Sequence, residues 1–300
     1  MVLDPLLGCL PRGLEPSRWC ADGAAGLCLR LTDGAISPAP MLGFCRDLPG
    51  GWSEEMLAHV SQLHPVPDEL SDGQAVLVEP LSVALHGILQ EAPIAGERVL
   101  VIGAGVIGLC AIVALKLVAP GAEVTVVARH PVQRRMAERL GADHLVAEPL
   151  QAAVEQAGAA RHRPLVGRDV LTGGFDQVVD SVGTAASLDS AVRTTRPRGR
   201  LLLLGGPAEI DRLDWTLVWT RELRIEGSYV YGREGSLPGE PHTLDLAMRL
   251  MLEHPELPIG ELVTHRFRLD QWRDAMRAVL DRRASGALKV VFAPGVSGEG

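Results

Sequence analysis

The chain has 300 residues, of which 47% are hydrophobic and 22% are charged. This composition is ordinary for a globular protein and offers enough material for two domains. The 29 basic and 37 acidic residues give a net charge of −8, which argues against a nucleic-acid partner. No apolar stretch reaches membrane-spanning length and no basic leader opens the chain, so we expect a cytoplasmic protein with no membrane partner.

The five cysteines suit a reducing compartment better than a disulfide framework, because their number is odd and four precede residue 50. The glycine- and proline-rich first 45 residues predict loops and short strands. Cys20 and Cys28 are spaced like half of a zinc lobe, but a closed structural site needs four ligands. Cys9 and Cys45 have no obvious partner spacing, so small buried thiols are the favoured alternative.

Apolar side chains at helical spacing predict a helix over residues 79–91, entered after Pro80. Glu79 stands at its start. A carboxylate there could bind metal or relay protons, or it could simply be favoured by the helix dipole, and the residues alone leave both alternatives open. His59 and His64 receive no catalytic role, because isolated histidines are more often surface or core residues.

The strongest single motif is a Gly-x-Gly-x-x-Gly turn that follows the apolar run 98–102 and opens a helix. In a dinucleotide-binding unit, Gly103 makes the tight turn, Gly105 lets the backbone approach a pyrophosphate, and Gly108 packs the helix on the strand. FAD- and S-adenosylmethionine-binding folds use similar turns, and a purely structural turn is a further alternative. The predicted phosphate-binding residues are Gly103, Ala104, Gly105, Val106, Ile107 and Gly108.

Strands and helices then alternate. Strands are predicted at 124–128, 144–146, 175–183, 200–206 and 223–230, and helices at 131–140, 149–158 and 186–195, with a polar loop at 159–173. With the run before the glycine turn, this gives six parallel strands, an α/β doubly wound Rossmann sheet. Cofactors cross strand carboxyl ends in such sheets, which adds four candidate cofactor-binding residues, Ser181, Val182, Gly183 and Gly205.

The pattern changes after Tyr231. Helices are predicted at 243–254 and 270–283, and strands at 262–269 and 287–294. The predicted domains are therefore a Rossmann domain over 80–230 and a second domain formed by 1–79 and 231–300.

The end of the second sheet strand bears on cofactor choice. NAD-selective sites usually carry an acidic residue there, but this position is Ala128, followed by Arg129. With His130 and Arg134 adding positive charge, the segment predicts NADP, with NAD as the alternative. A surface role for Arg129 remains the competing interpretation.

Ten segments of the chain carry a family pattern in unbroken order: GFCRDLPGGWSEEMLAH, VPDEL, LVEPLSVALHG, GERVLVIGAGVIGL, RRMAERLGAD, FDQVVDSVG, PRGRLLLLG, ELRIEGSY, LVTHRFRLD and GALKVVF. Together they resemble the zinc-type medium-chain dehydrogenases/reductases, in the branch of alcohol, polyol and threonine dehydrogenases. The resemblance implies a GroES-like second domain, NAD(P)-dependent hydride transfer with a small alcohol or carbonyl substrate, and zinc. The resemblance is also compatible with assembly of the chain into a homo-oligomer.

This sequence departs from the family pattern in two places. The structural zinc pattern of the family, C-x2-C-x2-C-x7-C, places its last two cysteines on Cys20 and Cys28 but its first two on Leu14 and Ser17. The family's catalytic zinc cysteine and Gly-His-Glu segment would precede Met1, so only Glu79 matches a residue at the catalytic metal. We therefore expect an incomplete GroES-like domain and no retained zinc, since a catalytic site needs about three protein ligands.

The main functional prediction is an NAD(P)-dependent oxidoreductase of the alcohol dehydrogenase type. One alternative is a non-catalytic dinucleotide-binding or interaction protein, from a truncated or degenerate family member. Another is a zinc-independent reductase. The catalytic proton donor is unknown, and the sequence leaves the substrate open.

Overall fold

The computed structural model describes residues 1–211 and 213–293. The chain divides into two compact units, one formed by residues 1–82 with the chain from 230 on, and the other by residues 83–229. None of the described helices is long and apolar enough to cross a membrane. Pro294, the last residue of the predicted strand 287–294, and the residues after it lie outside the described part.

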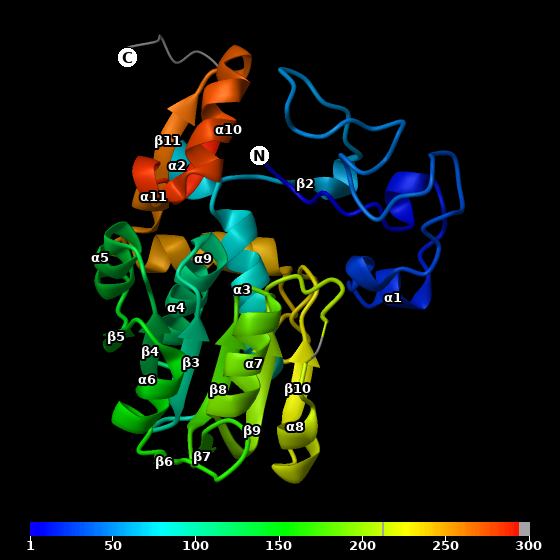
Figure 1. Ribbon diagram of the computed structural model, residues 1–300. Coiled ribbons are helices and arrows are strands. Elements are labelled where there is room, and N and C mark those ends of the chain that lie inside the picture. The colour runs from blue at the N-terminus through cyan, green and yellow to red at the C-terminus, as the bar shows by residue number, and fades with distance from the viewer. Residues whose placement is uncertain (212, 294–300) are drawn as a thin grey trace. The chain divides into compact units, whose positions relative to one another are not determined.

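The unit of residues 83–229 is built on one sheet of six parallel strands (Figure 1). In spatial order they are β10 (Arg224–Gly227), β9 (Thr195–Leu203), β8 (Phe175–Asp180), β3 (Arg98–Ile102), β4 (Glu123–Val127) and β5 (His144–Val146). The chain starts in the middle with β3, builds outward to β5, and then returns through β8 to the other edge. This order is that of the doubly wound dinucleotide-binding fold, so the prediction of a Rossmann sheet is confirmed.

The helices of this unit are α4 (Val106–Val118), α5 (Pro131–Arg139), α6 (Pro149–Glu155), α7 (Ala185–Thr194) and α8 (Thr216–Thr220), while α3 (Val78–Gln90) leads into it. Helix α4 is apolar around its whole circumference and buried from Gly108 to Leu115, as expected of a helix packed on central strands. The edge strand β10 is mostly exposed, and its sequence RIEG is accordingly polar.

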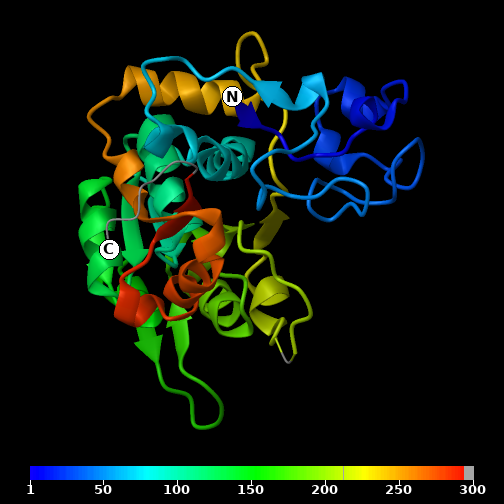
Figure 2. The same cartoon turned by 90° about the horizontal axis from the view of Figure 1, so that it is seen from above.

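The segment 159–173, predicted as a loop, contains an antiparallel hairpin of β6 (Ala160–His162) and β7 (Val170–Thr172). Figure 2 shows this hairpin extending from its unit as a long green loop. Its strands have three residues each and are largely exposed, so they carry no apolar alternation that a sequence pattern could register.

The other unit has two small sheets. β1 (Val2–Leu3) pairs with β2 (Leu63–His64) antiparallel, and β11 (Val263–Phe267) pairs with β12 (Lys289–Phe292) parallel. Its longer helices are α9 (Thr243–Glu253) and α10 (Trp272–Leu280), and its single-turn helices are α1 (Arg18–Ala21), α2 (Asp72–Ala75) and α11 (Arg282–Ser285). Short 3-10 helices lie at Leu10–Arg12, Ala25–Leu27, Val60–Gln62, Ile259–Leu262 and Leu269–Gln271. That this unit is an incomplete GroES-like domain stays a prediction.

Arg12 ties the loop at residues 33–39 to the start of the chain. Its side chain is 1% exposed, and its guanidinium donates hydrogen bonds to the carbonyl oxygens of five residues, namely Leu7, Asp33, Ile36, Ser37 and Ala39. Because buried backbone carbonyls need partners, one arginine can thus satisfy the carbonyl oxygens of a loop that forms no helix or strand.

Candidate functional site

The turn between β3 and α4 has the features of a phosphate-binding loop. Gly103 has a φ of +97°, a left-handed conformation that side chains rarely adopt. A Cβ at Gly105 would meet no atom within 4 Å, so open space lies beside the backbone there. Gly105 is the N-cap of α4 and supplies no side-chain cap, which leaves first-turn N–H groups and the positive helix end available to an anion.

The third glycine of the motif is needed for packing. A Cβ at Gly108 would lie 2.0 Å from the Gly103 carbonyl oxygen and 2.7 Å from the Ser181 hydroxyl. No side chain fits in that space, so Gly108 brings α4 close to the turn, as the motif predicts.

The turn after β8 lies against this glycine turn. The Ser181 hydroxyl donates to the carbonyl oxygens of Ile102 (2.9 Å) and Gly103 (3.2 Å). Gly183, with a φ of +75°, contacts Gly205, where a Cβ would lie 2.5 Å from the Gly183 nitrogen. The structure therefore brings the predicted residues 181–183 and Gly205 to the same sheet edge as the glycine motif, at the switch point where such folds bind nucleotides.

Asp180, which no sequence pattern singled out, shapes this second turn. Its Oδ1 accepts N–H groups of Val182 (2.9 Å) and Gly183 (3.2 Å), and its Oδ2 accepts the Ser187 hydroxyl (2.9 Å). Burial raises the pKa of Asp180, while the two N–H groups act to lower it. The available signal was an acidic residue at the end of an otherwise apolar strand.

The segment after β4 carries the residues predicted to select the cofactor. Arg129 is exposed and has no hydrogen-bond or ion-pair partner in the described part of the chain. Arg134 is different, because its guanidinium donates to the carbonyl oxygens of Ala128 (3.2 Å) and Leu145 (3.4 Å). Arg134 thus stabilises the loop through these two hydrogen bonds. Arg129 makes no such contact, so its guanidinium is the one available to a ligand.

Glu79 lies in the first turn of α3, in the other unit. It lines a pocket of about 590 Å³ with Trp52, Val76 and Lys289. Burial raises the pKa of the Glu79 carboxyl, and the charge of Lys289 opposes this. Among residues 1–211 and 213–293, two groups of three side chains could hold a metal ion, and neither includes Glu79.

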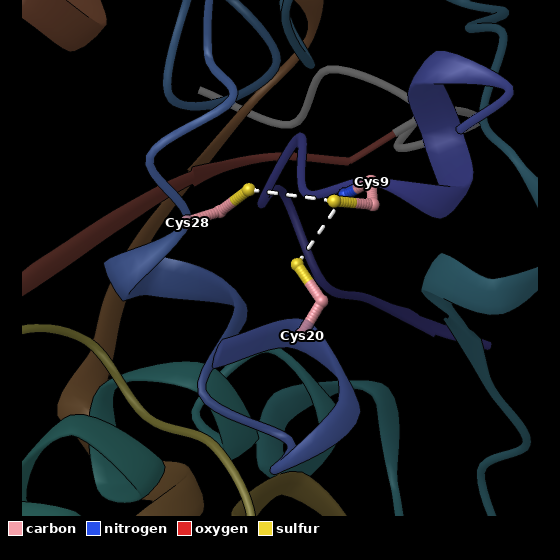
Figure 3. A group of neighbouring side chains, drawn as sticks. All are labelled: Cys9, Cys20 and Cys28. Carbon is pink, nitrogen blue, oxygen red and sulfur yellow. Dashed lines mark hydrogen bonds between the residues drawn. The ribbon is translucent and has the colours of Figure 1, made fainter. Parts of the chain in front are cut away.

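The first of these groups consists of Cys9, Cys20 and Cys28, whose sulfur atoms lie within 4.8 Å of one another. Figure 3 shows the three thiols pointing toward one another. Cys9, which has no obvious partner spacing in the sequence, thus lies beside Cys20 and Cys28 in the structure. Its sulfur lies 3.6 Å from that of Cys28, across 19 residues of irregular chain. Cys45 lies outside the group and contacts the Ser37 hydroxyl at 3.3 Å.

The second group consists of Asp4, His64 and His242. His64 Nδ1 lies 2.9 Å from Asp245 Oδ1, and His242 Nδ1 accepts the N–H of Leu244 at 3.3 Å. The proton of the neutral His242 ring is then on Nε2, which faces Asp4 Oδ2 at 3.9 Å. This arrangement fits hydrogen bonding better than metal coordination, because a metal ligand must offer a lone pair.

Three comparisons bear on the family of this chain. The family model "Zinc-binding dehydrogenase" matches residues 106–252. L-threonine 3-dehydrogenase of Mesorhizobium japonicum is 29% identical over 251 residues, which is 84% of this chain and 66% of the relative. D-arabinitol dehydrogenase 1 of Uromyces fabae is 27% identical over 252 residues, 82% of this chain and 65% of the relative. The chain thus spans just under two thirds of the length of these relatives.

Solved structures agree with the sequence relatives. A zinc-binding dehydrogenase of Sinorhizobium meliloti 1021, bound to NADP, superposes with a TM-score of 0.73 at 25% identity, covering 98% of this chain and 76% of that one. The chain resembles the zinc-binding dehydrogenases in sequence and in fold. The 2R,3R-butanediol dehydrogenase of Bacillus subtilis, at 23% identity and a TM-score of 0.70 over 98% of this chain and 73% of its own, shares the fold.

Similarity to zinc-binding dehydrogenases calls for a test of the metal ligands that this chain offers. Glu79 belongs to no group of three potential ligands among the described residues, so the site around it does not fit a catalytic zinc ion, which needs about three protein ligands. The three thiols fit far better, because thiolates are the preferred ligands of structural zinc.

Proposed function

We propose that the chain binds a nicotinamide dinucleotide at the edge of the Rossmann sheet. The observation that carries this proposal is the open space beside Gly105 at the uncapped N-terminus of α4. A pyrophosphate there would accept backbone N–H groups of the turn and meet the positive end of a 13-residue helix. The NADP bound to the S. meliloti relative supports the same class of ligand.

We further propose NADP as the preferred dinucleotide. The position that would carry an acidic residue in an NAD-selective site is Ala128, and the exposed Arg129 follows it. A guanidinium without a protein partner can donate two parallel hydrogen bonds to a 2′-phosphate.

The reaction that these features favour is hydride transfer between the nicotinamide ring and an alcohol or carbonyl carbon. The bound cofactor supplies the hydride chemistry, and the protein fixes its position through the turns at residues 103–108 and 181–183. The names of the relatives, a threonine and an arabinitol dehydrogenase, favour small hydroxylated substrates. No step is assigned to a catalytic metal, because Glu79 alone does not fit one.

A second candidate is a dinucleotide-binding protein without catalysis. It is favoured by the observation that, among the described residues, Glu79 belongs to no group of three potential metal ligands. A test with deuterium-labelled secondary alcohols distinguishes the two candidates, since only an oxidoreductase transfers the label to the nicotinamide ring.

Calorimetric titration with NADPH tests the binding proposal directly. Gly105→Val should abolish binding while the protein stays folded, because the side chain would occupy the proposed pyrophosphate space. Gly235→Val is a matched control, since a Cβ at Gly235 also meets no atom within 4 Å but lies in the other unit. Unchanged affinity in Gly105→Val would make the turn purely structural.

A further inference from the structure

The hairpin β6–β7 ends in two adjacent apolar side chains that no other part of the described chain covers. Leu165 is fully exposed, and Val166 is 89% exposed. Pro164 precedes them and Gly167, with a φ of +98°, follows them, so both side chains lie at the tip of the projecting turn (Figure 2). Single apolar residues are common on protein surfaces, but this adjacent pair forms a compact contact point, the apolar tip.

The hairpin is fixed to helix α7, so the apolar tip is held in place. The Arg168 guanidinium donates two hydrogen bonds to the Asp189 carboxylate on α7, at 2.6 and 2.7 Å. Arg193 of the same helix donates to the Asp169 carbonyl oxygen at 2.5 Å, and Arg161 Nε donates to the Asp169 carboxylate at 2.6 Å. A contact point that is already ordered loses little conformational entropy on binding.

The same unit contains an apolar pocket of about 440 Å³. The pocket lies between α7, β9, β10 and the segments 207–210 and 213–215, and the described residues that line it are all apolar. Trp215 is one of them and is 55% exposed. This lining favours an apolar occupant. Because Leu165 is fully exposed, the apolar tip does not occupy the pocket of its own chain.

The hairpin and the pocket carry opposite charge. Residues 161–169 include three arginines and one aspartate, and the Arg163 side chain is 91% exposed. Residues 207–215 include three acidic residues and one arginine in their sequence, and Glu209 and Asp214 are exposed. Opposite charges favour the encounter of two surfaces and fix their register.

The base of the hairpin and the pocket belong to one surface of the unit. Arg168 of the hairpin binds Asp189, and the preceding residue, Leu188, lines the pocket. The pKa of Asp214 is lowered by hydrogen bonds from Thr216 and further by the charge of Arg168. In a two-fold dimer each copy uses the same surface, so a tip and a pocket on one surface can meet reciprocally.

We propose that two copies of this chain form a two-fold dimer in which the apolar tip of each copy enters the apolar pocket of the other. Leu165 and Val166 are then removed from water in both copies, and the arginines of each hairpin face the acidic residues beside the pocket. The dimer needs no bound dinucleotide, so the inference is independent of the proposed function.

Sedimentation velocity of the full chain tests the dimer, which has twice the 32.0 kDa mass of the chain. We expect a dimer at micromolar concentration. The double variant Leu165→Asp, Val166→Asp should weaken dimerisation about hundredfold or more, because the burial of both side chains is lost. Leu280→Asp is the matched control, since Leu280 is 79% exposed but lies in the other unit, and it should leave dimerisation unchanged. A monomeric wild type, or a dimer that persists in the double variant, would refute the proposal.

Photo-cross-linking identifies what the apolar tip contacts. A photoreactive amino acid replaces Leu165, and isotope-labelled and unlabelled chains are mixed before irradiation. We expect cross-links between a labelled and an unlabelled chain, in peptides that line the pocket, such as those containing Leu188 or Ile210. Cross-links within one chain only would show that the hairpin folds onto its own pocket, and cross-links to another surface of the second copy would place the contact elsewhere. Either result would contradict the proposal.

Discussion

The Ser181 hydroxyl donates a 2.9 Å hydrogen bond to the carbonyl oxygen of Ile102 and so joins the carboxyl ends of the two central strands, β8 and β3. The same hydroxyl lies 2.7 Å from the place where a Cβ of Gly108 would stand. Ser181 thus fills the space that the third motif glycine leaves free. The two turns at the switch point of the sheet are therefore packed as one body, while the space beside Gly105 stays open.

This packing predicts different outcomes for two glycines of one motif. Gly108→Ala should destabilise the fold by about 3 kcal/mol or more, because its Cβ would lie 2.0 Å from a backbone oxygen that cannot easily move. Gly105→Val should cost much less stability, because its Cβ meets open space. Denaturant unfolding of the two variants measures the difference, and equal free energies of unfolding would contradict the packing described.

Cofactor choice can be tested at Arg129. Arg129→Ala should weaken NADPH binding by about 1.5–3 kcal/mol, the range for hydrogen bonds to charged groups, and leave NADH binding nearly unchanged. Arg135→Ala is a suitable control, because it removes the same charge from an exposed position on α5. Titration with both cofactors decides the matter. Equal losses for the two, or a wild-type preference for NADH, would remove Arg129 from the site.

The sequence predicted the parts of this protein whose pattern is local. The central strands β3, β4 and β8 are largely apolar and buried runs, and the glycine spacing at 103–108 prescribes its own geometry. The contacts of side chains whose partners lie far along the chain could not be predicted from such local patterns. Cys9 meets Cys28 through irregular backbone that has no period, and Arg12 binds carbonyl oxygens up to 27 residues away.

Arg134 illustrates a different limit. Its charge and its place near the second strand suggested a cofactor contact, but the sequence could not show that its guanidinium is held by the Ala128 and Leu145 carbonyl oxygens. Short elements such as α8 and the hairpin β6–β7 were missed because three to five residues are too few to display a period. Cofactor binding by the predicted residues stays a prediction until it is measured.

Arg12 provides a stability prediction for the N-terminal region. Arg12→Leu should lower the free energy of unfolding of this unit by about 3 kcal/mol or more, because several buried carbonyl oxygens would lose their donor. Arg18→Leu is the control, since that side chain is 84% exposed and only 3.9 Å from Asp22 in a surface ion pair. Hydrogen exchange around residues 33–39 reports the loss locally, and unchanged protection there would contradict the role given to Arg12.

The cluster of Asp4 and His242 couples folding of its unit to pH. Burial raises the pKa of Asp4 to about 6, and burial lowers the pKa of His242 to about 4. The charged and titratable groups that influence these two residues or hydrogen-bond nearby are His64, Glu79, Tyr231, Arg233, Glu234 and Asp245. Both shifts favour the neutral forms, as expected for side chains removed from water.

The two shifts act on stability in opposite directions. The folded state holds the Asp4 proton between pH 4 and 6, where the unfolded chain releases it, so this contribution is lost as the pH rises through that range. The folded state keeps His242 neutral where the unfolded chain takes up a proton, so that contribution is lost as the pH falls from about 6.5 to 4.

The Asp4→Asn variant keeps an oxygen acceptor for the N–H of Leu6 but removes the contribution of Asp4 to the pH dependence. The variant should therefore gain stability over wild type as the pH rises from 4 to 7, by at most about 3 kcal/mol, and lose stability more steeply on acidification. Unfolding measured at pH 4, 5, 6 and 7 tests this, and a stability difference that does not change with pH would show that Asp4 titrates as it does in the unfolded chain.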